Sequence, residues 1–211
     1  SYHGNTGSAI AATGDWRRVP NEFSRGHVHF FNPYLYRSEF NAATEEEECQ
    51  RALAHLRRII ECEGPTAIAA ILLESIPGTA GILVPPAGYM QGVRALADEF
   101  GIVLILDEVM AGFGRTGKLF AMQHYEVKPD LMTMAKSLAG GFPLSGVVGR
   151  AEVMDAPAPG GLGGTYAGNP LAVAAAHAVL DVIAEEQLCQ RAEQLGSHLQ
   201  EVLNQARATC P

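Results

Sequence analysis

A chain of 211 residues is long enough to bury a substantial core and to form one large domain or a domain and a half. Its apolar content of 47% and charged content of 18% are those of a globular protein and exclude a disordered chain. The net charge of −8 argues against nucleic-acid binding, and the apolar runs are too short to span a bilayer. We therefore predict neither a nucleic-acid partner nor a membrane partner.

The first 45 residues have little periodicity and predict a short helical start followed by a long surface excursion. Apolar residues then recur at helical spacing from Thr44 until Gly64. Beyond that point predicted strands alternate with predicted helices. The strands are 67–74, 102–109, 131–135 and 144–149, and the helices are 88–100, 169–184 and 186–206. Continuous apolar strands in this order predict an α/β fold, with a mostly parallel central sheet covered by helices on both faces.

Two of the predicted strands end in ionisable residues. Asp107 follows an apolar strand, and Lys136 follows the next one along the chain. The carboxyl ends of parallel strands line one crevice, which is where such sheets bind ligands. A carboxylate and an amine in one crevice suit pyridoxal 5'-phosphate (PLP), whose aldehyde forms a Schiff base with lysine and whose ring nitrogen pairs with an acid. A lysine after a buried strand suits nucleophilic use, although a strand-end acid and a surface lysine are the plainer alternative.

Two glycine-rich stretches are candidates for phosphate binding. Residues 112–117 match the G-x-G-x-x-G pattern, but no persistent helix follows them, so a tight loop is the better interpretation than a dinucleotide site. Residues 160–170 lead into a predicted helix, where backbone amides and the Thr165 hydroxyl can receive a phosphate. The alternative role of the second stretch is helix capping by Asn169 and Pro170, and both roles are compatible.

The histidines and cysteines indicate no metal site. His27 and His29 alternate as on one strand face, but no third ligand lies near them in sequence, so we predict no metal. The four cysteines are scattered without a Cys-x-x-Cys pair, and no signal peptide is visible. Reduced thiols and a cytoplasmic location are therefore expected.

The motifs Asp107–Gly117, Met134–Lys136 and Gly164–Thr165 occur in an order that resembles the class III PLP-dependent aminotransferases, the ω-aminotransferase group. The similarity extends from Tyr2 to the last predicted helix. It implies PLP fold type I and transfer of an amino group from an ω-amino acid of the 4-aminobutyrate type to an α-keto acid such as 2-oxoglutarate. It also implies that residues 1–211 are the central part of the PLP-binding large domain. On this view residues 186–211 begin the segment toward the C-terminal domain, and the N-terminal and C-terminal parts of the fold are absent.

The resemblance also implies roles for individual residues. Lys136 is similar to the Schiff-base lysine and Asp107 to the partner of the pyridine nitrogen. Val109 resembles the apolar residue on one face of the cofactor ring, and Tyr2, followed by His3 at the cofactor, resembles the aromatic residue on the other face. Glu74 matches the acid at the end of the preceding strand.

Thr165 is similar to the threonine that reaches the phosphate of the cofactor in the partner subunit, which implies a homodimer or a dimer of dimers.

Two positions depart from the 4-aminobutyrate type. Met110 stands at the cofactor where a glutamine usually reaches the phenolic oxygen, and a thioether cannot donate that hydrogen bond. Thr79 stands where an acid usually pairs with a switching arginine. The segment 78–88 resembles the ω-amino acid–pyruvate transaminases, whereas 119–188 resembles 4-aminobutyrate transaminase. An ω-amino acid–pyruvate enzyme of the β-alanine or taurine type, or an inactive fragment, therefore remains the alternative.

Overall fold

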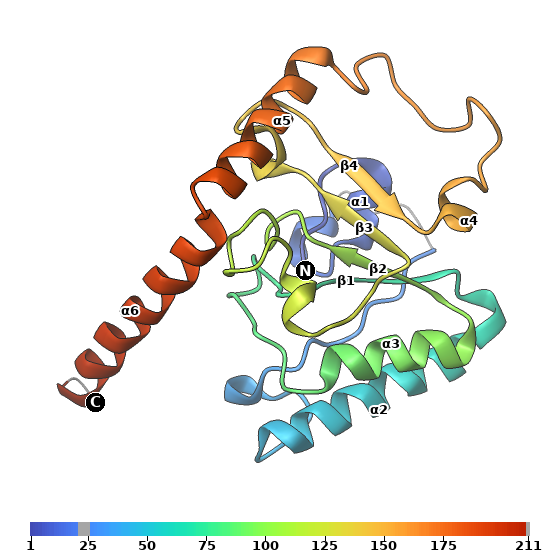
Figure 1. Ribbon diagram of the computed structural model, residues 1–211. Coiled ribbons are helices and arrows are strands. Elements are labelled where there is room, and N and C mark those ends of the chain that lie inside the picture. The colour runs from blue at the N-terminus through green and yellow to red at the C-terminus, as the bar shows by residue number, and fades with distance from the viewer. Residues whose placement is uncertain (21–25, 210–211) are drawn as a thin grey trace.

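The computed structural model describes residues 1–20 and 26–209 (Figure 1). Its helices and strands are α1 (Gly7–Ala12), α2 (Glu45–Glu63), β1 (Ala70–Glu74), α3 (Tyr89–Phe100), β2 (Val103–Asp107), β3 (Leu131–Met134), β4 (Gly146–Gly149), α4 (Ala151–Met154), α5 (Pro170–Glu185) and α6 (Leu188–Thr209). Short 3-10 turns are Trp16–Arg18, Leu35–Arg37, Pro65–Ala67, Ala121–His124 and Lys136–Ala139. Among the described residues, no helix has both the length and the apolar character needed to cross a bilayer.

The four strands form one sheet in the order β1-β2-β3-β4. β1 pairs with β2 and β2 with β3 in parallel, whereas β4 runs antiparallel to β3. The prediction of a mostly parallel sheet is therefore confirmed. The predicted strand 67–74 begins three residues too early, because Pro65–Ala67 closes a 3-10 turn before β1 starts at Ala70.

One face of β1 and β2 carries the main core. In the parallel register Ile71 lies beside Leu104 and Leu73 beside Leu106, so these four side chains share a face. Helices α2 and α3 pack on that face. The helical residues buried there are Cys49, Ala52, Leu56, Ile60, Tyr89, Met90, Val93, Leu96 and Ala97.

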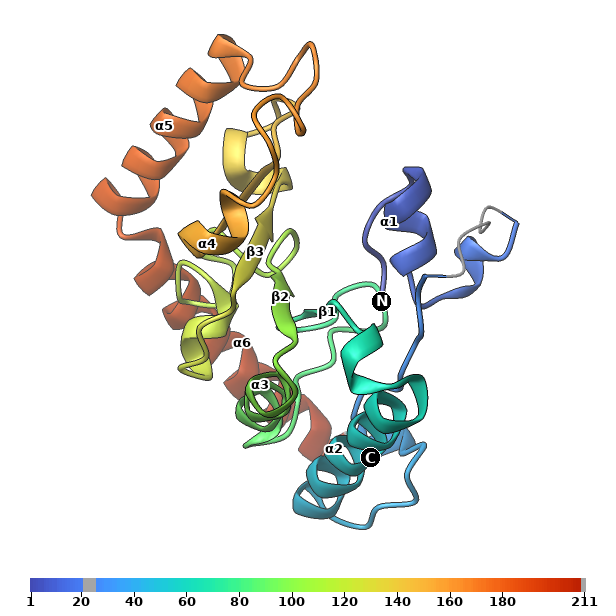
Figure 2. The same cartoon turned by 90° about the vertical axis from the view of Figure 1, so that its right-hand side faces the viewer.

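The opposite face of the sheet carries polar residues at the strand ends. Glu74 lies beside Asp107 in the register, on the face that alternates with the core. Figure 2 shows the N-terminal segment and α1 on that side, away from α2 and α3. Helix α5 packs on the 3-10 turn Lys136–Ala139. Helices thus lie on both sides of the sheet, as the alternating pattern predicts.

Helix α2 begins and ends where its sequence signals predict. The Thr44 hydroxyl accepts a hydrogen bond from the Glu47 N–H at 3.2 Å, and the Glu47 carboxylate accepts one from the Ala43 N–H at 2.8 Å. These two bonds satisfy donors at the helix start reciprocally. Gly64, with φ of 88°, ends the helix in a conformation that favours glycine.

Asp130 joins the strands to α3. One of its carboxylate oxygens accepts from the Leu104 N–H at 2.7 Å and from Arg94 at 2.8 Å, and the other accepts from Arg150 at 2.8 Å. Burial raises the pKa of the Asp130 carboxyl, but these hydrogen bonds outweigh burial and lower the pKa to about 2.

The low pKa of Asp130 predicts a specific loss of stability in acid. The folded-state pKa of Asp130, about 2, lies below the ordinary value of 3.8. The ionised Asp130 carboxylate therefore contributes its full stabilisation at a pH above 3.8, and this stabilisation is lost as the pH falls through about 2. Urea unfolding across this range measures it. We expect the free energy of unfolding to fall more steeply with acid in the native protein than in Asp130→Asn. Equal pH dependence in the two proteins would contradict this assignment.

Candidate active site at the ends of β2 and β3

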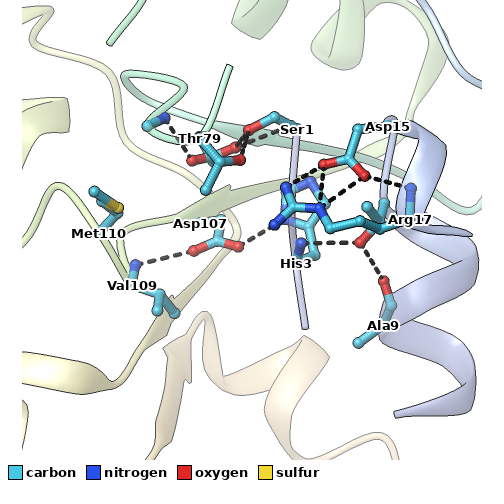
Figure 3. Close-up of polar contacts among 12 residues, drawn as sticks. Ser1, His3, Ala9, Asp15, Arg17, Thr79, Asp107, Val109 and Met110 are labelled. Atoms are coloured by element: carbon cyan, nitrogen blue, oxygen red, sulfur yellow. Dashed lines mark hydrogen bonds and ion pairs between the residues drawn. The ribbon is translucent and has the colours of Figure 1, made fainter. Parts of the chain in front are cut away.

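Asp107 ends β2 as a buried carboxylate, 6% exposed, on the polar face of the sheet. One carboxylate oxygen accepts a hydrogen bond from the Val109 N–H at 2.9 Å, and the other lies 2.7 Å from Nδ1 of His3 (Figure 3). These two contacts fix the orientation of the carboxylate. Since a carboxylate can accept about four hydrogen bonds, Asp107 keeps capacity for a further donor.

Lys136 follows β3 and begins a 3-10 turn with φ of 47°, in the left-handed region that non-glycine residues rarely adopt. Its Nζ lies 3.6 Å from Sδ of Met110. The Lys136 side chain is exposed, as in the alternative of a surface lysine. The 3-10 turn begins two residues after β3 ends at Met134.

Glu74 ends β1 beside Asp107 and is buried. Its carboxylate accepts from the Gly78 N–H at 2.9 Å and from the Ser1 hydroxyl. Burial raises the pKa of Glu74, but the hydrogen bonds outweigh burial and hold the pKa below its ordinary value. Two carboxyl groups therefore lie at neighbouring strand ends, each with its own hydrogen-bond donors.

The other residues expected at the cofactor differ in their surroundings. Val109 is half-buried directly after Asp107. Tyr2 is also half-buried, and the Arg17 guanidinium lies 4.3 Å from the centre of its ring. Arg17 thus covers one face of the Tyr2 ring, so a ligand could stack only on the opposite face. Thr165 is exposed on the turn that precedes α5.

A cavity of about 350 Å³ lies beside this site, between β1 and residues 28–32. Ser1, His3, Glu74 and Thr79 are among its lining residues, whereas Asp107 and Lys136 are not. The cavity is therefore adjacent to the predicted cofactor position and does not coincide with it.

His27 and His29 lie in irregular structure, so the expectation that they share a strand face is wrong. Within residues 1–20 and 26–209, no cluster of three or more His, Cys, Asp or Glu side chains is arranged to hold a metal. Cys49, Cys62 and Cys189 are free thiols, and Cys210 lies outside the described residues.

Glu108 is a buried residue of this region that sequence reasoning left without a role. Its carboxylate accepts from the Ser75 hydroxyl at 2.5 Å and from the backbone N–H groups of Ala121 at 3.0 Å and Met122 at 2.8 Å. It thereby ties the end of β2 to the residues after β1 and to the loop before β3. The position of this acid at the end of an apolar strand could have indicated a structural role, since acids are rarely buried without partners.

Residues 112–117 form consecutive turns after β2 with no helix directly behind them, so the predicted tight loop is confirmed. Gly114 and Gly117, with φ of 85° and 88°, adopt left-handed conformations. Cβ atoms built on them would lie 3.5 Å from Sγ of Cys189 and 3.2 Å from Cβ of Glu193. The loop therefore packs closely on the start of α6.

The residues present fit PLP by the chemistry of their donor set. Asp107 offers an oriented carboxylate to a ring nitrogen, and Lys136 offers an exposed primary amine to an aldehyde. Val109, half-buried directly after Asp107, offers an apolar surface to a ring. The three residues come from the ends of β2 and β3, which are neighbours in the sheet.

Comparison with known proteins identifies the family. The model for aminotransferase class-III matches residues 1–210, and the chain belongs to this family. The chain is 48% identical over 204 residues to 4-aminobutyrate aminotransferase GabT of Escherichia coli, covering 96% of the chain and 47% of GabT. It is 44% identical over 204 residues to the leucine/methionine racemase of Thermococcus litoralis, covering 94% of the chain and 45% of the racemase.

Solved structures agree on the fold. The taurine:2-oxoglutarate aminotransferase of Bifidobacterium kashiwanohense, solved with PLP and glutamate, superposes with a TM-score of 0.91 at 42% identity. The alignment covers 97% of this chain and 48% of that structure. The fold is therefore fold type I of the PLP-dependent transferases. The chain spans about half the length of the relatives it matches.

Proposed function

We propose that the protein is a PLP-dependent aminotransferase that transfers the amino group of an ω-amino acid of the 4-aminobutyrate type to an α-keto acid such as 2-oxoglutarate. The observation that carries this proposal is the pairing of a buried, doubly hydrogen-bonded Asp107 with Lys136 at the ends of adjacent parallel strands. The 48% identity to a 4-aminobutyrate aminotransferase supports the substrate class.

In this proposal Lys136 would hold the cofactor at its aldehyde carbon and Asp107 would hold it at the ring nitrogen. When bound, PLP supplies an electron sink that stabilises negative charge at the substrate carbon bearing the amine. Asp107 would keep a proton on that ring nitrogen, because its negative charge favours the protonated form. His3 and the Val109 N–H orient that carboxylate. When its amine is free, Nζ of Lys136 would act as the general base and then the general acid that moves a proton between two carbons of the reacting group.

We also propose that the active protein is a homodimer or a dimer of dimers in which Thr165 contacts the phosphate of the partner's cofactor. The exposed position of Thr165 before α5 supports this proposal. Exposed Leu195, Leu199 and Val202, spaced along α6, support contact with further protein surface. The free thiols are consistent with a reducing, cytoplasmic location, which we also propose.

A second candidate, transfer to pyruvate from a β-alanine or taurine type of donor, is favoured by Met110 and Thr79. Met110 places a thioether beside Lys136, where the 4-aminobutyrate type has a hydrogen-bond donor. Thr79 is exposed and provides a hydroxyl, where the 4-aminobutyrate type has a carboxylate. The two candidates differ in both donor and acceptor, so they are separable by the same assay.

Amine transfer from 4-aminobutyrate, 5-aminovalerate, β-alanine and taurine, each with 2-oxoglutarate or pyruvate, tests the proposal. We expect ping-pong kinetics, a strict need for a keto acid and the highest kcat/KM with 4-aminobutyrate and 2-oxoglutarate. Preference for pyruvate would favour the second candidate.

Racemisation of an α-amino acid without any keto acid would instead indicate chemistry like that of the racemase relative. Failure of the folded protein to retain PLP would reject both transaminase candidates and favour an inactive fragment.

A further inference from the structure

Met110 lies between two functional segments that are distant in sequence. A Cβ atom built on Gly78 would lie 2.8 Å from Sδ and 2.9 Å from Cγ of Met110. The same Sδ atom lies 3.6 Å from Nζ of Lys136. The thioether therefore contacts both the Gly78 backbone region and the Lys136 amine, and only a residue without a side chain at position 78 allows this packing.

The backbone is fixed at all three positions. The Gly78 N–H donates to the buried Glu74 carboxylate at 2.9 Å. The Met110 carbonyl accepts from Nε of Arg115 at 2.8 Å. Lys136 has a left-handed backbone, with φ of 47°, that sets the direction in which its side chain leaves the chain. The remaining conformational freedom lies mainly in the side chains of Met110 and Lys136, each of which has several rotamers. The packing of these two side chains against each other therefore determines where the Lys136 amine lies.

We propose that Met110 is a positioning residue for Lys136, and that the glycine at position 78 is what allows it to act. The Met110 side chain restricts the positions of the Lys136 amine and closes the space between that amine and the loop after β1. The packing stands independently of the proposed function, whereas its consequence for cofactor capture rests on that function.

Gly78→Ala is a direct probe of this arrangement. Gly78 lies outside the left-handed region, so alanine is compatible with its backbone. The atoms that the new methyl group would meet belong to the flexible Met110 side chain, so that side chain shifts while the surrounding fold persists. Gly196→Ala is the matched control, since a Cβ there has no neighbour within 4 Å.

The readout is the acetylation rate of Lys136 by acetic anhydride in cofactor-free protein, followed by peptide mass spectrometry, with the exposed Lys128 as internal reference. We expect Met110→Ala to raise the Lys136 rate, and Gly78→Ala to change it by about twofold or more, as coupling between contacting residues predicts. In the Met110→Ala background, Gly78→Ala should have no further effect. Gly196→Ala should keep the native rate.

Two results would overturn the proposal. Equal effects of Gly78→Ala with and without Met110 would show that the loop acts by another route. Unchanged Lys136 rates in both single variants would show that no positioning occurs. Should an alanine variant fail to fold by circular dichroism, Met110→Leu tests the same packing at similar volume. We expect it to keep the native rate, and a rate that departs by about twofold or more would count against the proposal.

The consequence for the cofactor is tested separately, by borohydride reduction after PLP is added. Trapping of PLP on Lys136 should change in Gly78→Ala and equal the Met110→Ala value in the double variant. Acetylation is measured without PLP, so it reports on positioning alone. A native protein that traps no PLP would therefore count against the proposed function while leaving the acetylation result interpretable.

Discussion

Lys136→Ala is expected to abolish covalent retention of PLP and to lower kcat for amine transfer by about 10²–10⁴-fold, the range that a positioned acid–base group contributes. The reason is that, in the proposed function, Lys136 supplies both the amine for the aldehyde and the group that moves the proton. Borohydride reduction followed by mass spectrometry measures retention, and coupled product detection measures kcat.

Lys128→Ala is the matched control, because Lys128 is also exposed and lies on the loop before β3. It should retain native trapping and native kcat. Full amine transfer by Lys136→Ala, or borohydride trapping that moves to another lysine without loss of activity, would refute the assignment of Lys136. Rescue of part of the activity by added methylamine would further support a proton-transfer role.

Asp107→Asn is expected to lower kcat by about 10²–10³-fold, comparable with the removal of one preorganised electrostatic partner at a reacting group. Asparagine keeps the shape of the side chain and can still accept from the Val109 N–H, which is 2.9 Å away in the native protein. It carries no negative charge, so it would not favour a proton on the ring nitrogen that Asp107 is proposed to hold. The expected change is therefore in catalysis more than in folding.

Stopped-flow kinetics and the visible absorbance of bound PLP measure the effect of Asp107→Asn. Asp181→Asn provides the control, since Asp181 is exposed on α5. A native kcat in Asp107→Asn would contradict the proposed pairing with the ring nitrogen. A lower thermal stability with unchanged kcat would assign Asp107 a structural role, through its contact with His3.

Much of the fold is predictable because local patterns and global packing agree. The signals at Thr44 and Gly64 bound α2 as expected, and β2 and β3 lie within their predicted ranges. The antiparallel direction of β4 was not predictable, because a short apolar strand has the same pattern in either direction.

The candidate site was predictable in part. The positions of Asp107 and Lys136 after two apolar strands predicted neighbouring strand ends, and the register of β2 with β3 confirms that those ends are adjacent. The exposure of Lys136 was not predictable, because it depends on the direction of the 3-10 turn after β3. The hydrogen-bond donors of Glu108 were also not predictable, since they come from segments on either side of it in the sequence.

The sequence by itself determined the family, the α/β order of elements and the two ionisable strand ends, because these depend on residue type and short spacing. Only the tertiary structure decided which residues surround them. His3 meets Asp107 across 104 positions, and Gly78 meets Met110 beside Lys136. Such contacts depend on where loops return to the sheet and on how side chains fill the space between them, which no local pattern encodes.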